Sequence, residues 1–218
     1  MLQLRAADGH EFEAFEAGNI NAPRCLVVLQ EIFGVNAHIR AVSERLASYG
    51  YRVLAPALFD RAERSVELGY DKPGIDKGIA LRAQISEAQT LLDLEATAAA
   101  FGAKPAGIIG YCWGGSLSWL AATKTEKFAA ASCWYGGGIA AQKDLTPTCP
   151  VQMHFGELDH GIPLKDVAAI RSAQPAVEVF VYEGAEHGFG CEARPSFSQK
   201  DWELAELRSL AFFAEHVR

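Results

Sequence analysis

Short apolar runs that alternate with amphipathic stretches constrain the fold of this 218-residue chain more than any other feature. Two alternating segments at the start are joined by the turn signal Asp8-Gly9. The apolar run Cys25–Leu29 is of the kind found in strands buried on both faces. Strands that alternate with helices predict an α/β fold with a mostly parallel central sheet and helices on both faces.

The periodicity places each expected element. Strands are expected at Leu2–Arg5, Glu11–Ala17, Cys25–Leu29, Arg52–Ala55, Ala106–Gly110, Ala129–Tyr135, Val151–Phe155 and Glu178–Tyr182. Helices are expected at Ile39–Tyr49, Ile79–Phe101, Trp113–Thr123, Leu164–Ala173 and Ser198–His216. Residues 57–77 show the weakest pattern. Because the chain has no repeat, low-complexity tract or linker, we expect a single domain over 1–218.

Composition excludes several functional classes. The formal net charge is −7 and the pI is near 5.4, without a basic run, which argues against a nucleic-acid partner. No apolar stretch approaches the roughly 18 residues of a spanning helix, and the N-terminus lacks a signal-peptide pattern, so no membrane partner is expected. The 5 cysteines are an odd number without a Cys-x-x-Cys pair. This pattern favours free thiols and a cytoplasmic location.

The segment 110–115 carries the strongest chemical signal. It reads Gly-Tyr-Cys-Trp-Gly-Gly, which has the form G-x-C-x-G at an expected strand-to-helix turn. This form matches the nucleophile elbow of hydrolases, with a cysteine in place of serine. The glycines leave room for a very tight turn, and the helix N-terminus favours a thiolate at Cys112. We therefore interpret Cys112 as a nucleophile rather than as a structural thiol.

An elbow nucleophile requires an acid and then a histidine further along the chain. Asp159 lies in the loop after the strand expected at 151–155, and Glu157 is a nearby alternative. His187 lies in the loop after the last expected strand. His160 is the one serious alternative to it. The order therefore favours Asp159 and His187.

These residues define a reaction mechanism. His187 would take the proton of Cys112 and return it to the leaving group, while Asp159 would fix the imidazole tautomer. Two backbone N–H groups should form the oxyanion hole. One belongs to Trp113, directly after the nucleophile, and the other to the loop after the third strand, at Ile32.

Four motifs together resemble the dienelactone hydrolase family. They are Gln30-Glu-Ile-Phe-Gly34, Gly110-Tyr-Cys-Trp-Gly-Gly115, Gly156-x-x-Asp159-His160 and Glu186-His187-Gly-Phe189. The resemblance implies an α/β-hydrolase fold, a Cys-His-Asp triad without a metal ion, and no cofactor. It also implies hydrolysis of an enol-lactone such as 4-carboxymethylenebut-2-en-4-olide, a step of bacterial chloroaromatic catabolism.

The resemblance assigns Glu31 to the site, because the family's glutamate contacts the nucleophilic thiol and helps to ionise it when substrate arrives. The chain departs from the family at Cys191, where the best-known members carry a substrate-binding arginine. Arg194 is a candidate to reach the site from its shifted position. Arg64 and Arg82 are weaker candidates for a second family arginine. Without a guanidinium at position 191, recognition of a carboxylate loses its strongest contact.

The favoured function is therefore hydrolysis of a small-molecule ester or lactone. Aromatic residues at expected strand ends, among them Phe33 and Tyr135, are candidates to line the substrate pocket. They favour, as an alternative, an esterase or acyl-transfer enzyme that acts on a neutral aromatic ester. A second alternative is a non-catalytic sensor that uses Cys112 as a reactive thiol. We expect a monomer or a small homo-oligomer.

Overall fold

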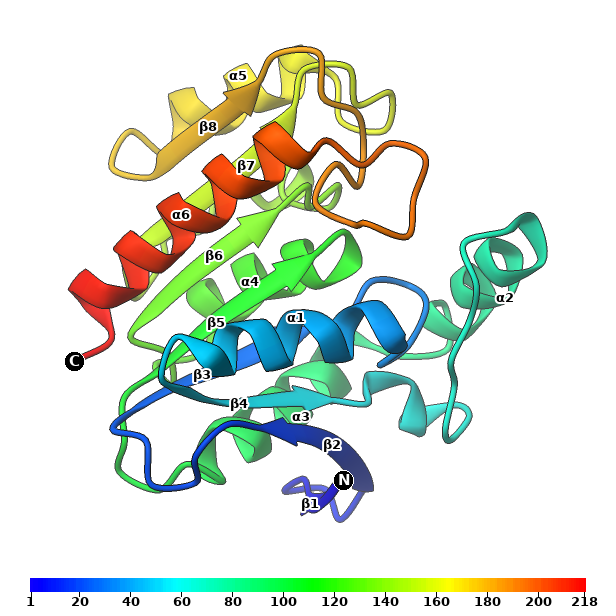
Figure 1. Cartoon of the computed structure of the whole chain (residues 1–218), viewed down its shortest axis with the longest axis vertical. Helices are drawn as coiled ribbons and strands as arrows, with labels where there is room; N and C mark the ends of the chain where they lie inside the picture. Colours follow the sequence, from blue (N-terminus) through cyan, green and yellow to red (C-terminus); the bar gives the residue numbers. More distant parts are fainter.

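The computed structural model describes all residues 1–218 and contains one eight-stranded sheet (Figure 1). The sheet order is β1-β2-β4-β3-β5-β6-β7-β8. The strands β1 and β2 run antiparallel to their neighbours, and the other strands are parallel. The strands are β1 (Leu2–Arg5), β2 (Glu11–Ala17), β3 (Arg24–Leu29), β4 (Tyr51–Pro56), β5 (Ala106–Tyr111), β6 (Ala130–Trp134), β7 (Val151–Gly156) and β8 (Glu178–Tyr182).

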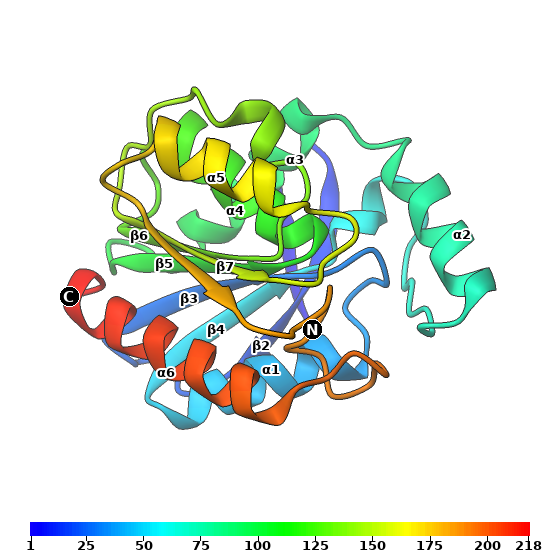
Figure 2. The ribbon, with the colours of Figure 1, turned by 90° about the horizontal axis from the view of Figure 1, so that it is seen from above.

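Helices cover both faces of this sheet (Figures 1 and 2). One face carries α1 and α6, the other carries α3, α4 and α5, and α2 projects from the body beside the sheet. The α-helices are α1 (Ala37–Ser48), α2 (Lys72–Arg82), α3 (Glu87–Ala99), α4 (Trp113–Lys124), α5 (Leu164–Ala173) and α6 (Gln199–His216). Two short 3₁₀ helices are η1 (Leu58–Arg61) and η2 (Ala140–Gln142).

The predicted α/β architecture is confirmed, and its physical basis is the burial of the central strands. Every residue of β4, β5, β6 and β7 is buried, as expected for parallel strands covered on both faces. The carboxyl ends of these parallel strands meet at one edge of the sheet, where open α/β sheets bind their ligands.

The single long helix predicted for Ile79–Phe101 is wrong. The chain forms two helices there, because α2 ends at Arg82 and α3 begins at Glu87. Ser86 caps α3: its hydroxyl accepts a hydrogen bond from the Gln89 backbone N–H at 3.3 Å. The Gln89 side chain in turn accepts one from the Ser86 N–H at 3.0 Å. This reciprocal capping box starts a new helix inside a segment whose apolar spacing looked continuous.

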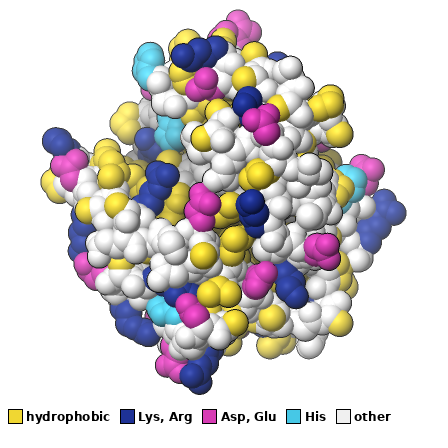
Figure 3. Space-filling view, turned by 180° about the vertical axis from the view of Figure 1, so that it is seen from behind, with side chains coloured by type: hydrophobic (Ala, Val, Ile, Leu, Met, Phe, Trp, Pro, Cys, Tyr) yellow, Lys and Arg dark blue, Asp and Glu magenta, His cyan; other side chains and the backbone are white.

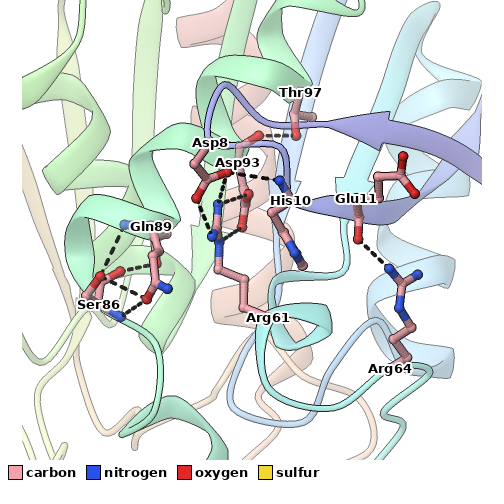
Figure 4. A network of polar contacts seen from close by, with 10 residues as sticks. Asp8, His10, Glu11, Arg61, Arg64, Ser86, Gln89, Asp93 and Thr97 are labelled. Atoms are coloured by element: carbon pink, nitrogen blue, oxygen red, sulfur yellow. Dashed lines mark hydrogen bonds and ion pairs between the residues drawn. The ribbon is translucent and has the colours of Figure 1, made fainter.

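The weakly patterned segment 57–77 contains η1 and the first turns of α2, and Arg61 anchors it (Figure 4). The Arg61 side chain is only 5% exposed and lies between two carboxylates. It contacts Asp93 of α3 at 2.7 Å and Asp8 of the β1–β2 turn at 2.7 Å. This cluster ties η1 to two elements that are distant in sequence.

The distribution of charge on the surface agrees with the absence of a basic run in the sequence. Figure 3 shows acidic and basic side chains interspersed on the face seen from behind, without a continuous area of one sign. None of the helices has the length and apolar character that crossing a membrane requires. All 5 cysteines are free thiols.

Candidate active site

Cys112 occupies the sharp turn between β5 and α4. Its backbone φ angle is +56°, a positive value that residues other than glycine rarely adopt. A Cβ atom on Gly110 would lie 2.0 Å from the Gly114 carbonyl oxygen, and one on Gly115 would lie 2.2 Å from the Trp134 oxygen. Only glycine fits at these positions, so the motif directly determines the turn that presents Cys112 at the N-terminus of α4.

His187 and Asp159 form a close pair in the loops beyond β8 and β7. The His187 Nδ1 lies 2.7 Å from Asp159 Oδ2, and the Asp159 side chain is fully buried. The second oxygen, Oδ1, accepts hydrogen bonds from the backbone N–H groups of Gly161 at 2.9 Å and Ile162 at 3.2 Å. These bonds fix the carboxylate, which orients the imidazole so that Nε2 is available for chemistry.

Electrostatics strengthen His187 as a base. Burial alone would lower the pKa of His187, but the hydrogen bond with Asp159 and the neighbouring Cys112 thiol outweigh burial and raise this pKa to about 10. A raised pKa makes the imidazole a stronger acceptor for the thiol proton. Neither alternative residue forms such a pair: the His160 side chain is exposed and makes no hydrogen bond, and Glu157 accepts a hydrogen bond from the Gly184 N–H at 2.9 Å.

The loop after β3 lies directly against the elbow. The Gly114 N–H donates to the Gln30 carbonyl at 3.1 Å. A Cβ atom on Gly114 would lie 2.5 Å from the Leu29 oxygen. This contact packs the start of the loop that contains Ile32 against α4, whose first residue is Trp113. On its other side the loop meets α2, because a Cβ atom on Gly78 would lie 2.0 Å from the Ile32 carbonyl oxygen. The loop after β3 is therefore packed on Gly114 at Leu29 and Gln30, and on Gly78 at Ile32.

Glu31 is buried at the same loop and holds an ion pair. Its Oε2 accepts a hydrogen bond from the Tyr70 hydroxyl at 2.8 Å, and its Oε1 accepts one from Arg194 Nη1 at 3.3 Å. No hydrogen bond joins Glu31 to the Cys112 thiol, in contrast to the contact implied by the resemblance. The carboxylate is instead drawn away by Tyr70 and Arg194.

Arg194 thus reaches the site although position 191 is a cysteine. Its guanidinium packs on Gly188, where a Cβ atom would lie 2.6 Å from Nη1. The other candidate arginines lie elsewhere. Arg64 donates to the Glu11 carbonyl outside the site (Figure 4), and Arg82 lines a separate small cavity beside Trp113.

A cleft of about 450 Å³ opens beside this cluster. Tyr70, Asp159, His187, Arg194 and Ser196 contribute to its lining. The two aromatic residues predicted to line the pocket are almost fully buried, so they do not form the cleft surface.

Those two buried aromatic residues instead pack against two residues that line the cleft. The Phe33 ring lies 4.4 Å from the Tyr70 ring, between centroids, and Tyr135 meets the His187 ring edge-on at 5.2 Å. Sequence reasoning missed Tyr70, because it lies in the weakly patterned segment and only tertiary structure brings it to Glu31.

Comparison with known proteins gives consistent matches. The model of the Dienelactone hydrolase family matches residues 12–217. The "Putative carboxymethylenebutenolidase" of Synechocystis sp. is 40% identical over 193 residues, which cover 79% of this chain and 78% of that protein. The "Carboxymethylenebutenolidase" of Pseudomonas putida is 30% identical over 225 residues, with 98% and 95% coverage.

The fold of a solved structure supports the same family relationship. The "Putative Dienelactone Hydrolase from Klebsiella pneumoniae subsp. pneumoniae MGH 78578" superposes with a TM-score of 0.80 at 32% identity and covers 97% of each chain. The resemblance and the α/β-hydrolase fold expected from the sequence are both confirmed.

Proposed function

Since the chain belongs to the dienelactone hydrolase family and is an ester or lactone hydrolase, we propose that Cys112 is its nucleophile, with His187 as base and Asp159 as the residue that orients His187. The observation that carries this proposal is the buried Asp159–His187 pair at 2.7 Å beside a cysteine held at positive φ. A structural thiol or a simple sensor has no need of this arrangement.

Acylation starts from the pair in which the Cys112 proton lies on His187 Nε2, because the raised pKa of His187 keeps its imidazole protonated near neutral pH. The thiolate attacks the ester or lactone carbonyl, and the negative charge that develops on the carbonyl oxygen is stabilised by the N–H groups of Ile32 and Trp113. As the intermediate collapses, the bond to the leaving oxygen breaks and His187 donates its proton to that oxygen. Asp159 stays ionised and stabilises the imidazolium in between.

Deacylation repeats these steps with water. His187 accepts a proton from a water molecule, and the hydroxide attacks the thioester carbonyl. The same two N–H groups stabilise the second intermediate. Its collapse breaks the carbon–sulfur bond, the proton returns to Cys112, and a carboxylic acid is released.

Arg194 is the only arginine or lysine that lines the cleft, and it pairs with the buried Glu31. Glu31 accepts one hydrogen bond from Arg194, and the arginine side chain makes no other, so most of its donors remain for a ligand. We assign Arg194 to the recognition of an anionic group on the substrate, in place of the arginine missing at Cys191. The buried carboxylate of Glu31 holds the guanidinium at the wall of the cleft.

Trapping of the acyl-enzyme tests the proposed nucleophile. A brief reaction with p-nitrophenyl acetate, quenched in acid, should leave an acetyl group on the peptide that contains Cys112. The Cys112→Ala variant should show neither the acetyl group nor hydrolysis, and its circular dichroism should remain that of the wild type. Cys149→Ser is the matched control, because Cys149 is a free thiol outside the site. An acetyl group on another residue, or retention of more than about a tenth of the rate by Cys112→Ala, would contradict the assignment.

A further inference from the structure

Three potential metal ligands, one of them Glu31 itself, lie close together beneath the surface of the cleft. They are Glu31, His38 and Cys191, and their ligand atoms all lie within 4.8 Å of one another. Glu31 and Cys191 are fully buried. The Nε2 atom of His38 is also buried and has no hydrogen-bond partner. A buried nitrogen without a partner costs about 1–3 kcal/mol, so it needs an explanation.

We propose that Glu31, His38 and Cys191 bind a zinc ion, and that the bound ion inhibits hydrolysis. A thiolate, an imidazole nitrogen and a carboxylate oxygen are the donors that zinc selects in proteins. Ligand atoms about 2.0–2.3 Å from a tetrahedral zinc ion lie roughly 3.3–3.8 Å apart, so the three side chains need to move together by about 1 Å. A water molecule completes the tetrahedron.

Binding requires a proton to leave. The Cys191 thiol loses its proton to the solvent as the sulfur–zinc bond forms, because only the thiolate is a ligand. In the metal-free protein, burial and the neighbouring Glu31 carboxylate raise the pKa of Cys191 to about 12, which keeps this thiol protonated. Each bound ion therefore releases one proton.

Arg194 competes with the ion for Glu31. Its single hydrogen bond to that carboxylate is 3.3 Å long, and its side chain is 21% exposed, so it can turn towards the solvent. The zinc ion would then occupy Glu31 and displace the arginine from the wall of the cleft. The expected inhibition rests on the roles proposed above for Glu31 and Arg194, whereas metal binding itself does not.

Cys112 and His187 are a second thiol and imidazole, so the test must remove the nucleophile. In the Cys112→Ala variant, Co²⁺ titration should produce the sulfur-to-cobalt absorption of a thiolate ligand together with the visible bands of a tetrahedral ion. Adding Cys191→Ser should abolish the sulfur-to-cobalt absorption, and Cys149→Ser should leave it unchanged. His38→Phe, which keeps a ring against Tyr111, should weaken binding more than the roughly 10–100-fold typical of a residue that only supports a ligand.

One further substitution should increase the affinity for cobalt, which is expected only for an ion bound at this site. Arg194→Gln in the Cys112→Ala background should tighten cobalt binding, because it removes a positive charge beside the ion. Absorption that survives Cys191→Ser, or affinity unaffected by His38→Phe, would overturn the site. For inhibition, Zn²⁺ should slow hydrolysis by the wild type reversibly, with recovery on addition of a chelator, and should affect His38→Phe much less. Equal inhibition of both would place the inhibitory ion at Cys112 and His187 and overturn the inhibitory role alone.

Discussion

Two of the charge clusters in this molecule use their arginines in opposite ways. Arg61 donates four hydrogen bonds, two to Asp93 and two to Asp8, and its side chain is 5% exposed (Figure 4). Arg194 donates one long hydrogen bond to Glu31 and borders an open cleft. An arginine has five N–H donors, so the first is nearly saturated and the second is largely free.

The number of free N–H donors distinguishes an arginine with a structural role from one that is available to bind a ligand. A guanidinium whose donors are almost all used inside the protein serves to connect elements, and Arg61 connects η1, α3 and the β1–β2 turn. A guanidinium held by one contact keeps donors for a ligand. The same contrast holds for the acids, because the Asp93 carboxylate accepts hydrogen bonds only from Arg61, whereas Asp159 faces a histidine that must gain and lose a proton. The comparison predicts that changes in one cluster affect stability and changes in the other affect rate.

The largest effect is expected for Asp159→Asn. The hydrogen bond with Asp159 raises the pKa of His187 to about 10, so its loss should lower that pKa and weaken the base. Loss of a triad carboxylate lowers kcat by roughly 10⁴-fold in the best-studied case, and we expect about 10³–10⁴-fold here. The alkaline limb of the kcat/KM profile, which reports loss of the imidazolium proton, should move to lower pH. A rate within about tenfold of the wild type would show that Asp159 is not the orienting residue.

Asp93→Asn should produce the opposite outcome. It leaves the buried Arg61 charge with only Asp8, and breaking a buried pair costs about 3–5 kcal/mol of unfolding free energy. Urea denaturation measures this cost, while kcat per folded molecule should not change. Asp8→Asn is the milder control, because Asp8 lies near the surface. Equal stability of the Asp93→Asn variant and the wild type would remove the distinction between the two clusters.

Arg194→Gln tests the free arginine directly. Hydrogen bonds to charged groups contribute about 1.5–3 kcal/mol, so kcat/KM for a p-nitrophenyl ester with a carboxylate on its acyl chain should fall by roughly 10- to 100-fold. A neutral ester of similar size should be affected far less. Arg64→Gln, outside the site, is the matched control and should change neither. An equal loss on both substrates would mean that Arg194 supports the site without reading the substrate's charge.

The smallest effect is expected for Glu31→Gln. The amide keeps the hydrogen bond from Tyr70 but no longer pairs with Arg194, so the guanidinium should be held less firmly and kcat should fall by about tenfold or less. Stability should change little. The control is Glu67→Gln, which breaks the exposed pair with Arg40 and should affect neither rate nor stability. A Glu31→Gln variant with wild-type kcat for anionic and neutral esters alike would reduce Glu31 to an ordinary buried carboxylate.

The sequence predicted those parts of the fold that short-range patterns determine. The central strands follow from unbroken apolar runs, and the turn at Cys112 follows from glycines whose Cβ atoms would clash. The long helix was wrong because the capping box of Ser86 and Gln89 acts over three residues and leaves the apolar spacing intact.

Interactions between distant segments were beyond the sequence patterns. The triad candidates could be placed, since loops after parallel strands meet at one edge. Tyr70 could not be placed, because nothing in its neighbourhood marks it and its partner Glu31 is 39 residues away. The cluster of Arg61, Asp93 and Asp8 was missed for the same reason. Arg194 was only one of several candidates until the structure placed it beside Glu31.

The close approach of Gly78 to Ile32 has a consequence for how new activities can be engineered. Only Gly74, Gly78 and Leu81 of α2 are buried, and the helix stands out from the body (Figure 1). A segment attached at so few points behaves as an exchangeable module. Its outward-facing residues can be randomised while Gly78, which lies against the Ile32 carbonyl, and Tyr70, which lines the cleft just before α2, are retained. Such libraries should keep the melting temperature of the parent, whereas libraries that vary Gly78 should lose activity through displacement of the Ile32 peptide.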